Sequence, residues 1–477
     1  MSAPAVVIAA PASGSGKTTV ATGLVGALRR AGHRVAPFKV GPDYIDPGYH
    51  GLAAGRPGRN LDPVLVGVER VVPMYRHGAT GCDLAVVEGV MGLFDGRIDA
   101  ADARPVAEGS TAQVAGLLGA PVVLVVDARG HSQSLAALLH GFATYDSSIR
   151  LGGVILNRVG SERHEQVLRA ACDRVGLPVL GCLPRMPQLE VPSRHLGLIP
   201  AVEHGAAATA AVDAMTELAA AHLDLRAIAA LAASSTTGPA WDPATALRAG
   251  ADTASLGPAS LGLSSEPPGG GPVIAMAGGA AFTFGYAEHR ELLVAAGARV
   301  VVFDPLHDEL PRGTAGLVLP GGFPEEHAAD LAANTRLLAA VAAAARRGMP
   351  IHAECAGLLY LTRALDGHAM AGVIDATAEF GPRLTLGYRD AVALVDSPLW
   401  QAGQRVRGHE FHRTRLLGTG ADAPAWGWHT AGERVREGAI VHRVHASYLH
   451  THPAGNPESV HRFATAAADF AHADAVG

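Results

Sequence analysis

Residues 6–19 read VVIAAPASGSGKTT, an apolar run followed by a loop with two glycines that ends in Lys-Thr-Thr. Apolar residues then recur every four positions from Val20 to Leu28, which predicts a helix directly after the loop. A strand, a glycine-containing loop and a helix in this order are typical of phosphate-binding loops. Pro11 stands where such loops usually have their first glycine. The alternative, a chance Lys-Thr after a glycine-rich turn, does not account for the flanking strand and helix.

The loop supplies the groups that a nucleotide triphosphate needs. Gly14 and Gly16 let backbone N–H groups approach phosphate oxygens, and Lys17 brings positive charge to the β- and γ-phosphates. The Thr18 hydroxyl is placed to bind Mg²⁺, and Thr19 completes the loop. We therefore expect ATP and Mg²⁺ to bind at this loop.

Over residues 1–231, short apolar runs alternate with helical patterns, which predicts an ATP-binding domain built on a parallel α/β sheet. The expected strands of this domain are Val6–Ala9, Val35–Lys39, Leu84–Glu88, Val122–Asp127 and Gly153–Asn157. An alanine-rich helix is expected over residues 206–223.

The amino-acid composition changes after this domain. Residues 232–271 are rich in Ser, Thr, Gly and Pro, which predicts a linker with one short helix. The βα alternation then resumes, so residues 272–477 are expected to form a second α/β domain, richer in strands from Thr385 onward. The strands expected at its start are Val273–Ala277, Arg299–Phe303, Gly316–Leu319 and Pro350–His352.

The composition excludes several classes of protein. A chain of 477 residues is too long for one ordinary domain, and 48% hydrophobic against 17% charged residues fits folded cores. A formal net charge of −6 gives no basic surface for a nucleic acid. The four cysteines contain no CxxC pair, so neither a zinc ribbon nor a disulfide framework is predicted. No apolar run is long enough to span a membrane and the start lacks a signal-peptide pattern, so a cytoplasmic protein is expected.

Acidic residues follow two strands of the first expected sheet, and they are Asp43, Asp46, Glu88 and Asp95. The carboxyl ends of parallel strands meet at one edge of a sheet, where ligands bind. Phosphates and a metal ion need charged partners that are held rigidly there. We expect Asp43 and Glu88 to bind the metal. For Asp46 and Asp95 two interpretations fit equally well: an acid of the same metal site, or an aspartate that caps a turn.

Asn157 ends another expected strand of this sheet. A strand-end asparagine can contact a purine edge through its amide, and it can also cap a turn. Both interpretations remain open at this position.

Residues 351–361, IHAECAGLLYL, predict a strand, a tight turn at Cys355 and an apolar helix. This is the architecture of a nucleophile elbow, with Cys in place of Ser and Ala353 where glycine is usual. The helix N-terminus is expected to lower the thiol pKa, and the N–H of Ala356 can bind an oxyanion. The Gly-Gly turn in LPGGFPE, residues 319–325, can supply a second N–H at Gly322. The alternative is a buried structural cysteine, but the elbow favours a nucleophile.

A nucleophilic cysteine also needs a base. Three histidines lie in VHASYLHTH, residues 444–452: His445, His450 and His452. Alternation places the last two on the same side if the strand continues through them. Because the chain has 23 histidines, position at a strand end is the feature that selects a candidate, and it favours His450.

These segments resemble the cobyrinate/hydrogenobyrinate a,c-diamide synthases of cobalamin biosynthesis. The resemblance covers nearly the whole chain apart from the linker, and its motifs come in the order of that family: KVGPDYIDPGYH, VEGVMGLFDG, LPGGFPE, HAECAGLLYL and ASYLHTH. It implies an N-terminal domain similar to dethiobiotin synthetase and a C-terminal class I glutamine amidotransferase domain. It also implies the reaction: ATP phosphorylates the a and c carboxylates of a corrin ring, and ammonia taken from glutamine converts each acyl phosphate to an amide.

The resemblance also implies roles for single residues of the synthetase site. Lys17 and Thr18 match nucleotide-phosphate contacts, Asp43 and Glu88 match acids that hold the metal or ATP, and Asp46 and Asp95 match further acids of the same site. Tyr44 and Ile45 lie between two of these acids and would position the substrate carboxylate. Asn157 matches an adenine contact.

In the second domain the resemblance makes Cys355 the glutaminase nucleophile and His450 its base. Class I glutaminases follow this histidine with Pro-Glu, whereas here Thr451-His452 follows. His452 therefore stands where the residue that orients the base is expected, and the usual Cys-His-Glu triad is incomplete in the sequence.

Two other hypotheses fit part of the sequence. One is a related amidotransferase that acts on other corrin carboxylates or on nickel-sirohydrochlorin; KVGPDYIDP favours the a,c enzyme. The other is a non-catalytic P-loop regulator with an inactive glutaminase-like domain, and the Cys355 elbow argues against it. A homodimer is compatible with this class of protein.

Overall fold

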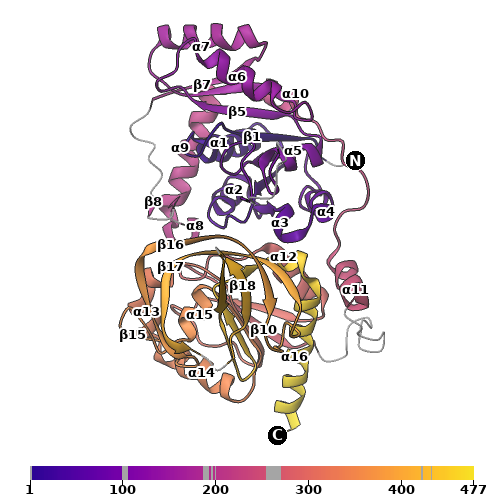
Figure 1. Ribbon diagram of the computed structural model, residues 1–477, viewed down its shortest axis with the longest axis vertical. Helices are drawn as coiled ribbons and strands as arrows, with labels where there is room; N and C mark the ends of the chain where they lie inside the picture. The colour runs from indigo at the N-terminus through magenta and orange to yellow at the C-terminus, as the bar shows by residue number, and fades with distance from the viewer. Residues whose placement is uncertain are drawn as a thin grey trace. The chain divides into compact units, whose positions relative to one another are not determined.

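The computed structural model describes residues 3–98, 106–185, 193–194, 197–198, 200–253, 270–420, 423–430 and 432–476 (Figure 1). The chain divides into two compact units, Met1–Trp241 and Asp242–Gly477. The division falls inside the segment expected to be a linker. That segment contains the helix α11 (Pro243–Thr253), and its residues 254–269 lie outside the described part of the chain.

The N-terminal unit is built on a seven-stranded sheet in the order β3-β2-β4-β1-β5-β6-β7, and every pair of neighbours in it is parallel. Its strands are β1 (Ala5–Ala9), β2 (Val35–Val40), β3 (Arg59–Leu61), β4 (Leu84–Glu88), β5 (Val122–Asp127), β6 (Leu151–Val159) and β7 (Val179–Pro184). The expected parallel α/β sheet is confirmed. Two strands were not predicted: β3 has only three residues, and glycine interrupts the apolar run of β7 at Gly181.

Helices connect the strands of this unit: α1 (Lys17–Arg30), α2 (Asp46–Ala54), α3 (Pro63–Val66), α4 (Val68–Gly78), α5 (Thr111–Leu118), α6 (Leu135–Thr144), α7 (Glu162–Val175), α8 (Ala201–His204), α9 (Ala206–His222) and α10 (Leu225–Leu231). A small antiparallel pair, β8 (Ser193–Arg194) and β9 (Gly197–Leu198), is also present. Helix α1 packs closely on α9 because two of its residues lack a side chain. A Cβ at Gly23 would lie 2.3 Å from the Met215 carbonyl oxygen, and one at Gly26 would lie 2.1 Å from Thr216 Oγ1. This packing fixes the helix that follows the phosphate loop.

The second unit contains a six-stranded sheet in the order β11-β10-β12-β13-β21-β20, parallel except for the pair β20–β21. Its strands are β10 (Val273–Ala277), β11 (Arg299–Phe303), β12 (Thr314–Leu319), β13 (Ile351–Glu354), β20 (Ala439–Val441) and β21 (Val444–Ser447). The strands expected at the start of this unit are confirmed, with bounds that differ by two residues at most.

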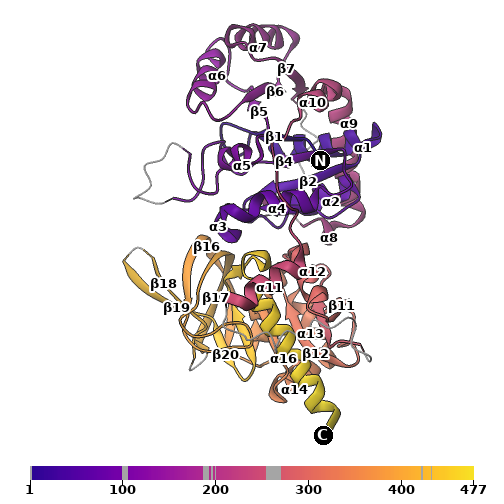
Figure 2. The same cartoon turned by 90° about the vertical axis from the view of Figure 1, so that its right-hand side faces the viewer.

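A second sheet of this unit is mainly antiparallel and follows the path β15-β14-β16-β17-β22, with β18 beside β16 and β19 beside β18. Its strands are β14 (Ala364–Leu365), β15 (His368–Ala369), β16 (Asp375–Ala393), β17 (Arg405–Gly420), β18 (Trp426–Thr430), β19 (Glu433–Glu437) and β22 (His450–Thr451). Figure 2 shows the long strands β16 and β17 side by side. The expected strand-rich segment is therefore present, and it begins before Thr385.

The remaining helices of the unit are α12 (Ala287–Ala295), α13 (Ala328–Ala333), α14 (Thr335–Arg346), α15 (Ala356–Leu361) and α16 (Pro457–Val476), with the 3₁₀ helices η2 (Pro324–His327) and η3 (Pro453–Gly455). Helix α16 packs on β12, and α11 packs on both α12 and α16 (Figure 2). Among the helices in the described ranges, none is both long and apolar enough to cross a membrane.

Candidate functional site

The phosphate loop connects β1 to α1, and its glycines have conformations that only glycine adopts without strain. Gly14 and Gly16 have φ angles of 77° and 95°. A Cβ at Gly16 would also lie 2.2 Å from Asn157 Nδ2. The Asn157 side chain donates a hydrogen bond to the Ser15 carbonyl oxygen at 2.9 Å, so it holds the loop from the end of β6. Asn157 therefore lies beside the phosphate loop, and its predicted contact with adenine stays a prediction.

Lys17 begins α1 and reaches toward the loop that follows β4. Its ammonium group donates to the Met91 carbonyl oxygen at 2.6 Å. Burial, followed by repulsion from Lys39, lowers the pKa of Lys17 to about 8. In the same loop, Asp95 accepts a hydrogen bond from the Gly92 N–H at 2.9 Å. Asp95 therefore caps this turn close to Lys17, and this contact fits the turn-capping alternative.

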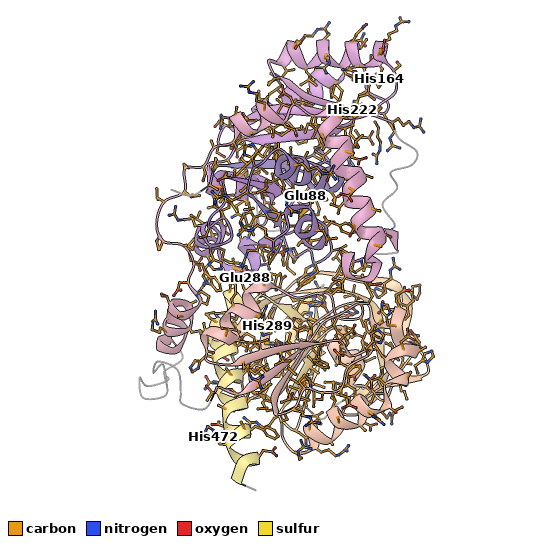
Figure 3. All side chains as sticks on the ribbon, turned by 180° about the vertical axis from the view of Figure 1, so that it is seen from behind. Glu88, His164, His222, Glu288, His289 and His472 are labelled. Carbon is orange, nitrogen blue, oxygen red and sulfur yellow. The ribbon has the colours of Figure 1, made fainter. Side chains whose placement is uncertain are left out.

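A buried cluster of charged groups lies directly beside the start of α1. The Thr18 hydroxyl donates to Glu88 Oε1 at 2.7 Å and lies 3.3 Å from Asp46 Oδ2. The Lys39 ammonium lies 2.6 Å from the same Asp46 oxygen and 2.9 Å from Glu88 Oε1. On the other side of Glu88, His50 Nε2 lies 2.7 Å from Oε2. Figure 3 shows Glu88 in the interior of the N-terminal unit.

Burial and the neighbouring charges shift the pKa values of the groups in this cluster. Burial, and then the neighbouring Asp43, raises the pKa of Asp46 to about 7. Burial opposes charge on Lys39 as well, but Asp46 and Glu88 together raise the pKa of Lys39 above its usual range. Burial likewise opposes charge on Glu88, but Lys39 and then His50 hold the pKa of that carboxyl well below its usual range. The cluster thus contains a stable ammonium–carboxylate pair and a second carboxylate, Asp46, that titrates near neutrality.

Sequence reasoning did not identify Lys39 or His50 as members of this cluster. The signal for His50 was its spacing: it lies four residues after Asp46 on α2, so both side chains share one face of that helix. Lys39 is the last residue but one of β2 and lies next to Glu88 in the parallel register of β2 and β4. Only the strand order reveals that the two ends meet.

The loop before α2 positions the other predicted residues. Asp43 Oδ1 accepts the backbone N–H groups of Ile45 and Asp46, at 2.8 and 2.9 Å, so this carboxylate caps the start of α2. Asn60 braces the same loop by donating to the carbonyl oxygens of Gly41 and Asp43. Ile45 is buried and Tyr44 is half-buried. In the part of the chain that the structure describes, no three His, Cys, Asp or Glu side chains form a group able to hold a metal ion.

In the second unit, Cys355 lies in the turn between β13 and α15, with φ 48° and ψ −98°. A positive φ at a residue other than glycine is strained, as in nucleophile elbows. The Cys355 N–H donates to the Ser447 carbonyl oxygen at 2.7 Å and so ties the turn to β21. Gly357 allows α15 to approach β12, because a Cβ there would lie 2.3 Å from the Leu319 carbonyl oxygen. The predicted elbow is present.

Two backbone N–H groups point at the Cys355 sulfur, those of Gly322 and Ala356. Gly322 lies in the Gly-Gly turn after β12, and the turn has no room for side chains. A Cβ at Gly321 would lie 2.3 Å from His450 Cε1, and one at Gly322 would lie 2.2 Å from the Ala281 carbonyl oxygen. The pair of N–H groups proposed for an oxyanion thus converges on the thiol.

The expected effect on the thiol pKa is wrong. Burial raises the pKa of the Cys355 thiol, the nearby Glu325 raises it further, and the N–H groups of Gly322 and Ala356 only partly oppose this. Helix α15 has six residues and its N-terminus cannot outweigh complete burial of the sulfur. The thiol is therefore protonated at neutral pH in this state.

The three candidate histidines lie in different surroundings. His450 is fully buried in β22, and its Nδ1 lies 3.6 Å from Glu354 Oε2. His445 points instead toward Ser397, with Nδ1 at 3.2 Å from Oγ. Strand β22 ends at Thr451, so the alternation does not extend to His452. The His452 side chain accepts the Ala454 N–H at 3.2 Å and caps η3.

Comparisons with known proteins assign a family to each part of the chain. Residues 6–199 match the family model of the CobQ/CobB/MinD/ParA nucleotide binding domain, and residues 273–457 match that of the CobB/CobQ-like glutamine amidotransferase domain. The chain is 58% identical to the hydrogenobyrinate a,c-diamide synthase of Mycobacterium tuberculosis, over 98% of this chain and 99% of that protein. The chain belongs to the a,c-diamide synthase family.

Other members of the a,c-diamide synthase family match over similar lengths. The hydrogenobyrinate a,c-diamide synthase of Streptomyces coelicolor is 56% identical, over 96% of each chain. The cobyrinate a,c-diamide synthase of Gloeobacter violaceus is 42% identical, over 94% of this chain and 93% of that protein. The chain is thus an enzyme, a glutamine-dependent ligase with a P-loop nucleotide-binding part and an amidotransferase part.

Proposed function

We propose that this enzyme converts the a- and c-side-chain carboxylates of a corrin-type tetrapyrrole, hydrogenobyrinate or cobyrinate, into amides in cobalamin biosynthesis. Each amide consumes one ATP and one glutamine and leaves ADP, phosphate and glutamate. One observation carries the proposal: a single chain holds a phosphate loop beside a buried acid cluster, and a cysteine elbow onto whose sulfur two N–H groups converge. The near full-length identity to enzymes named a,c-diamide synthase supports the choice of substrate.

The first half-reaction uses the phosphate loop. The N–H groups at Gly14 and Gly16, together with Lys17 and Thr19, would bind the phosphates of ATP. The substrate carboxylate attacks the γ-phosphorus, and the bond from that phosphorus to the β-phosphate bridging oxygen breaks to give an acyl phosphate and ADP. Lys17 is held at this position by the Met91 carbonyl oxygen, which orients its ammonium group.

The buried cluster fits Mg²⁺. Thr18 Oγ1 lies within 3.3 Å of carboxylate oxygens of both Asp46 and Glu88. Oxygen donors of this kind suit a hard cation whose other ligands are phosphate and water. When bound, Mg²⁺ would neutralise charge on the β- and γ-phosphate oxygens. Lys39 keeps the two carboxylates together and stops them from repelling each other.

The remaining predicted residues would position these groups. The sequence predicts Asp43 as a metal ligand together with Glu88; in this proposal Asp46 takes that place, because Asp43 Oδ1 accepts the N–H groups that start α2. Asp95 orders the loop that holds Lys17. Tyr44 and Ile45, between the two acids, would align the substrate carboxylate. Asn157, next to Gly16, would fix the loop and contact the adenine.

The second half-reaction begins at Cys355. Its sulfur attacks the side-chain amide carbon of glutamine while His450 takes the thiol proton. The N–H groups of Gly322 and Ala356 stabilise the oxyanion. His450 then protonates the leaving nitrogen, ammonia departs, and water hydrolyses the thioester to glutamate. The ammonia attacks the acyl phosphate at its carbonyl carbon and displaces phosphate.

Mass spectrometry of purified reactions tests the proposal. The enzyme is incubated with ATP, Mg²⁺ and glutamine, and with hydrogenobyrinate, cobyrinate or nickel-sirohydrochlorin as substrate. We expect two amides on one of the corrins, or on both. Conversion of neither corrin would contradict the substrate assignment, and conversion of nickel-sirohydrochlorin alone would favour the related amidotransferase.

A matched variant separates the two half-reactions. Cys355→Ser is expected to abolish amidation with glutamine but to retain it with ammonium chloride, because ammonia bypasses the glutaminase. Unchanged glutamine-dependent activity in this variant would show that Cys355 is not the nucleophile.

A further inference from the structure

We propose that Glu354, the residue directly before the nucleophile, orients the base His450 and so completes a Cys-His-Glu arrangement that the sequence order conceals. The inference rests on the proposed glutaminase function of Cys355 and His450. Glu354 is a positioning residue here, since it acts on glutamine only through His450.

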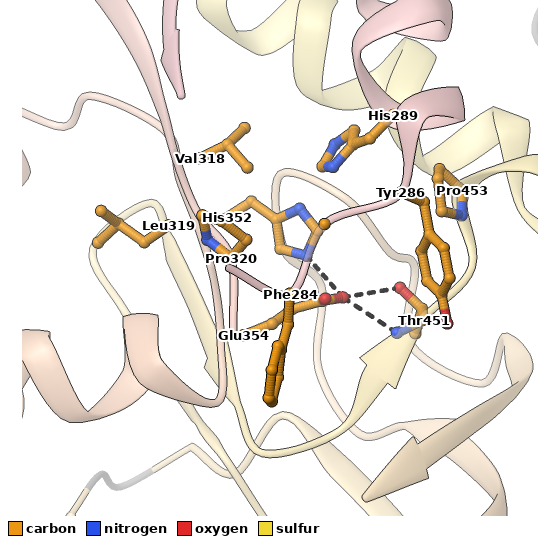
Figure 4. Close-up of a pocket in the computed structure, with 11 residues that line it drawn as sticks. Phe284, Tyr286, His289, Val318, Leu319, Pro320, His352, Glu354, Thr451 and Pro453 are labelled. Carbon is orange, nitrogen blue, oxygen red and sulfur yellow. Dashed lines mark hydrogen bonds and ion pairs between the residues drawn. The ribbon is translucent and has the colours of Figure 1, made fainter. Parts of the chain in front are cut away.

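Three contacts hold the Glu354 carboxylate in place. Its Oε1 accepts the backbone N–H and the hydroxyl of Thr451, at 3.1 and 3.0 Å, and lies 3.3 Å from His352 Nε2. Figure 4 shows these contacts converging on the carboxylate. The second oxygen, Oε2, lies 3.6 Å from His450 Nδ1. Because Thr451 is the next residue after His450, the same carboxylate anchors the backbone of the base and faces its ring.

This arrangement favours the tautomer of His450 that a base needs. A carboxylate beside Nδ1 favours the ring form that carries its proton on Nδ1, which leaves Nε2 to exchange a proton with the thiol. It also stabilises the imidazolium that forms when the proton moves. The distance of 3.6 Å is longer than an ordinary hydrogen bond, as is common in active sites before substrate binds.

Glu354 is ionised in these surroundings. Burial alone would raise its pKa, but His352 and His450 hold the pKa of this carboxyl well below its usual range. Four histidines face Glu354 from the elements packed around it: His352 on β13, His289 on α12, His445 on β21 and His450 on β22. Burial lowers the pKa of His289 to about 3, so that ring is neutral.

His452 cannot take the same role in this conformation. Its ring lies 4.0 Å from the ring of Tyr286, and its Nδ1 is occupied by the Ala454 N–H. It therefore stabilises η3, although it occupies the sequence position of the usual triad acid.

The space around the Glu354 carboxylate can hold a side chain of similar or smaller size. A cavity of about 20 Å³, lined by Tyr286, His289, His352, Glu354 and Thr451 among others, lies beside it and has room for about one water molecule (Figure 4). Glu354→Gln keeps the volume and an oxygen acceptor for Thr451 but removes the charge. Glu354→Asp keeps the charge on a shorter side chain. Both variants suit a test that separates charge from packing.

The experiment measures steady-state glutamine hydrolysis as a function of pH in the full chain, next to ammonia-dependent amidation. We expect Glu354→Gln to lower kcat for glutamine by about 10²- to 10⁴-fold, the range attributed to a general base, with KM changed little. The acid limb of kcat/KM, where the rate rises with pH, should move to lower pH, because the variant lacks the negative charge that stabilises an imidazolium. A packing defect would not move that limb. Glu354→Asp should lose less activity and keep the limb of the wild type.

His452→Asn is the matched control, because asparagine also caps a helix and the usual triad position is tested directly. We expect its acid limb to match the wild type. The proposal would be overturned if the acid limb moved in His452→Asn but not in Glu354→Gln. It would also be overturned if Glu354→Gln kept the kcat of the wild type. If Glu354→Gln also lost ammonia-dependent activity, the pH profile of Glu354→Asp would separate charge from packing. An acid limb that matches the wild type in this variant supports the proposal, and a shifted limb refutes it. Activity of Cys355→Ser with glutamine would refute the glutaminase itself, independently of Glu354.

Discussion

Replacing Lys39 by methionine should destabilise the N-terminal unit, because this lysine is the buried cation shared by two carboxylates. Its ammonium lies 2.6 Å from Asp46 and 2.9 Å from Glu88, and its side chain is only 5% exposed. Methionine keeps much of the volume but leaves two buried anions without that partner. Breaking a buried pair in this way costs about 3 to 5 kcal/mol.

The lower end of that range is expected. His50 remains 2.7 Å from Glu88, and Asp46 can take up a proton near neutral pH, so both carboxylates keep a way to reduce the unpaired charge. In a domain of this size, 1 kcal/mol shifts the melting temperature by about 2–4 °C, so a loss of about 3 kcal/mol lowers it by about 6–12 °C.

Thermal unfolding of the full chain measures the effect, with the N-terminal transition identified as the one that ATP and Mg²⁺ raise. Arg34→Met is the matched control. The Arg34–Asp83 pair has the same 2.6 Å separation as the Lys39–Asp46 pair, but its side chains are 70% and 40% exposed. Solvent screens such a pair, so its loss should leave the melting temperature nearly unchanged. Equal shifts in the two variants, or no shift in Lys39→Met, would refute the argument from burial.

Three further changes test other parts of the structure. The pKa of Asp46 is raised from 3.8 to about 7, so the folded state keeps a proton that the unfolded state releases; its stability should fall as pH rises through this window, and urea unfolding of Asp46→Asn should show a smaller fall. Gly16→Ala should greatly weaken ATP-dependent activity, because φ is 95° and the new Cβ would meet Asn157; activity near wild type would show that the loop adapts. Because burial raises the Cys355 pKa, iodoacetamide should alkylate this thiol slowly at neutral pH and faster beyond about pH 9, followed by peptide mass; a plateau reached below that pH would contradict a buried thiol.

The motifs that the sequence revealed are those in which neighbouring residues share one task. A phosphate loop needs its glycines, Lys17 and Thr18 in one turn, and a nucleophile elbow needs Cys355 between a strand and a helix. Local geometry of this kind follows from spacing alone. For the same reason, the nine strands that were predicted with bounds, five in the first unit and four in the second, agree with the structure to within two residues at each end. The long strands β16 and β17 were predicted only as part of a strand-rich segment.

The tertiary structure decided which of these residues meet and how they are charged. Strand order brings Lys39 beside Glu88, and the connection between the sheets brings His450 beside Glu354, although 49 and 96 positions separate the members of these pairs. Burial then reversed one expectation, because a helix terminus acts locally whereas desolvation of Cys355 depends on every element packed around it. By itself, the amino-acid sequence determined the phosphate loop and the cysteine elbow. Only the folded chain determined the partners and protonation of their side chains, since those depend on contacts between distant residues.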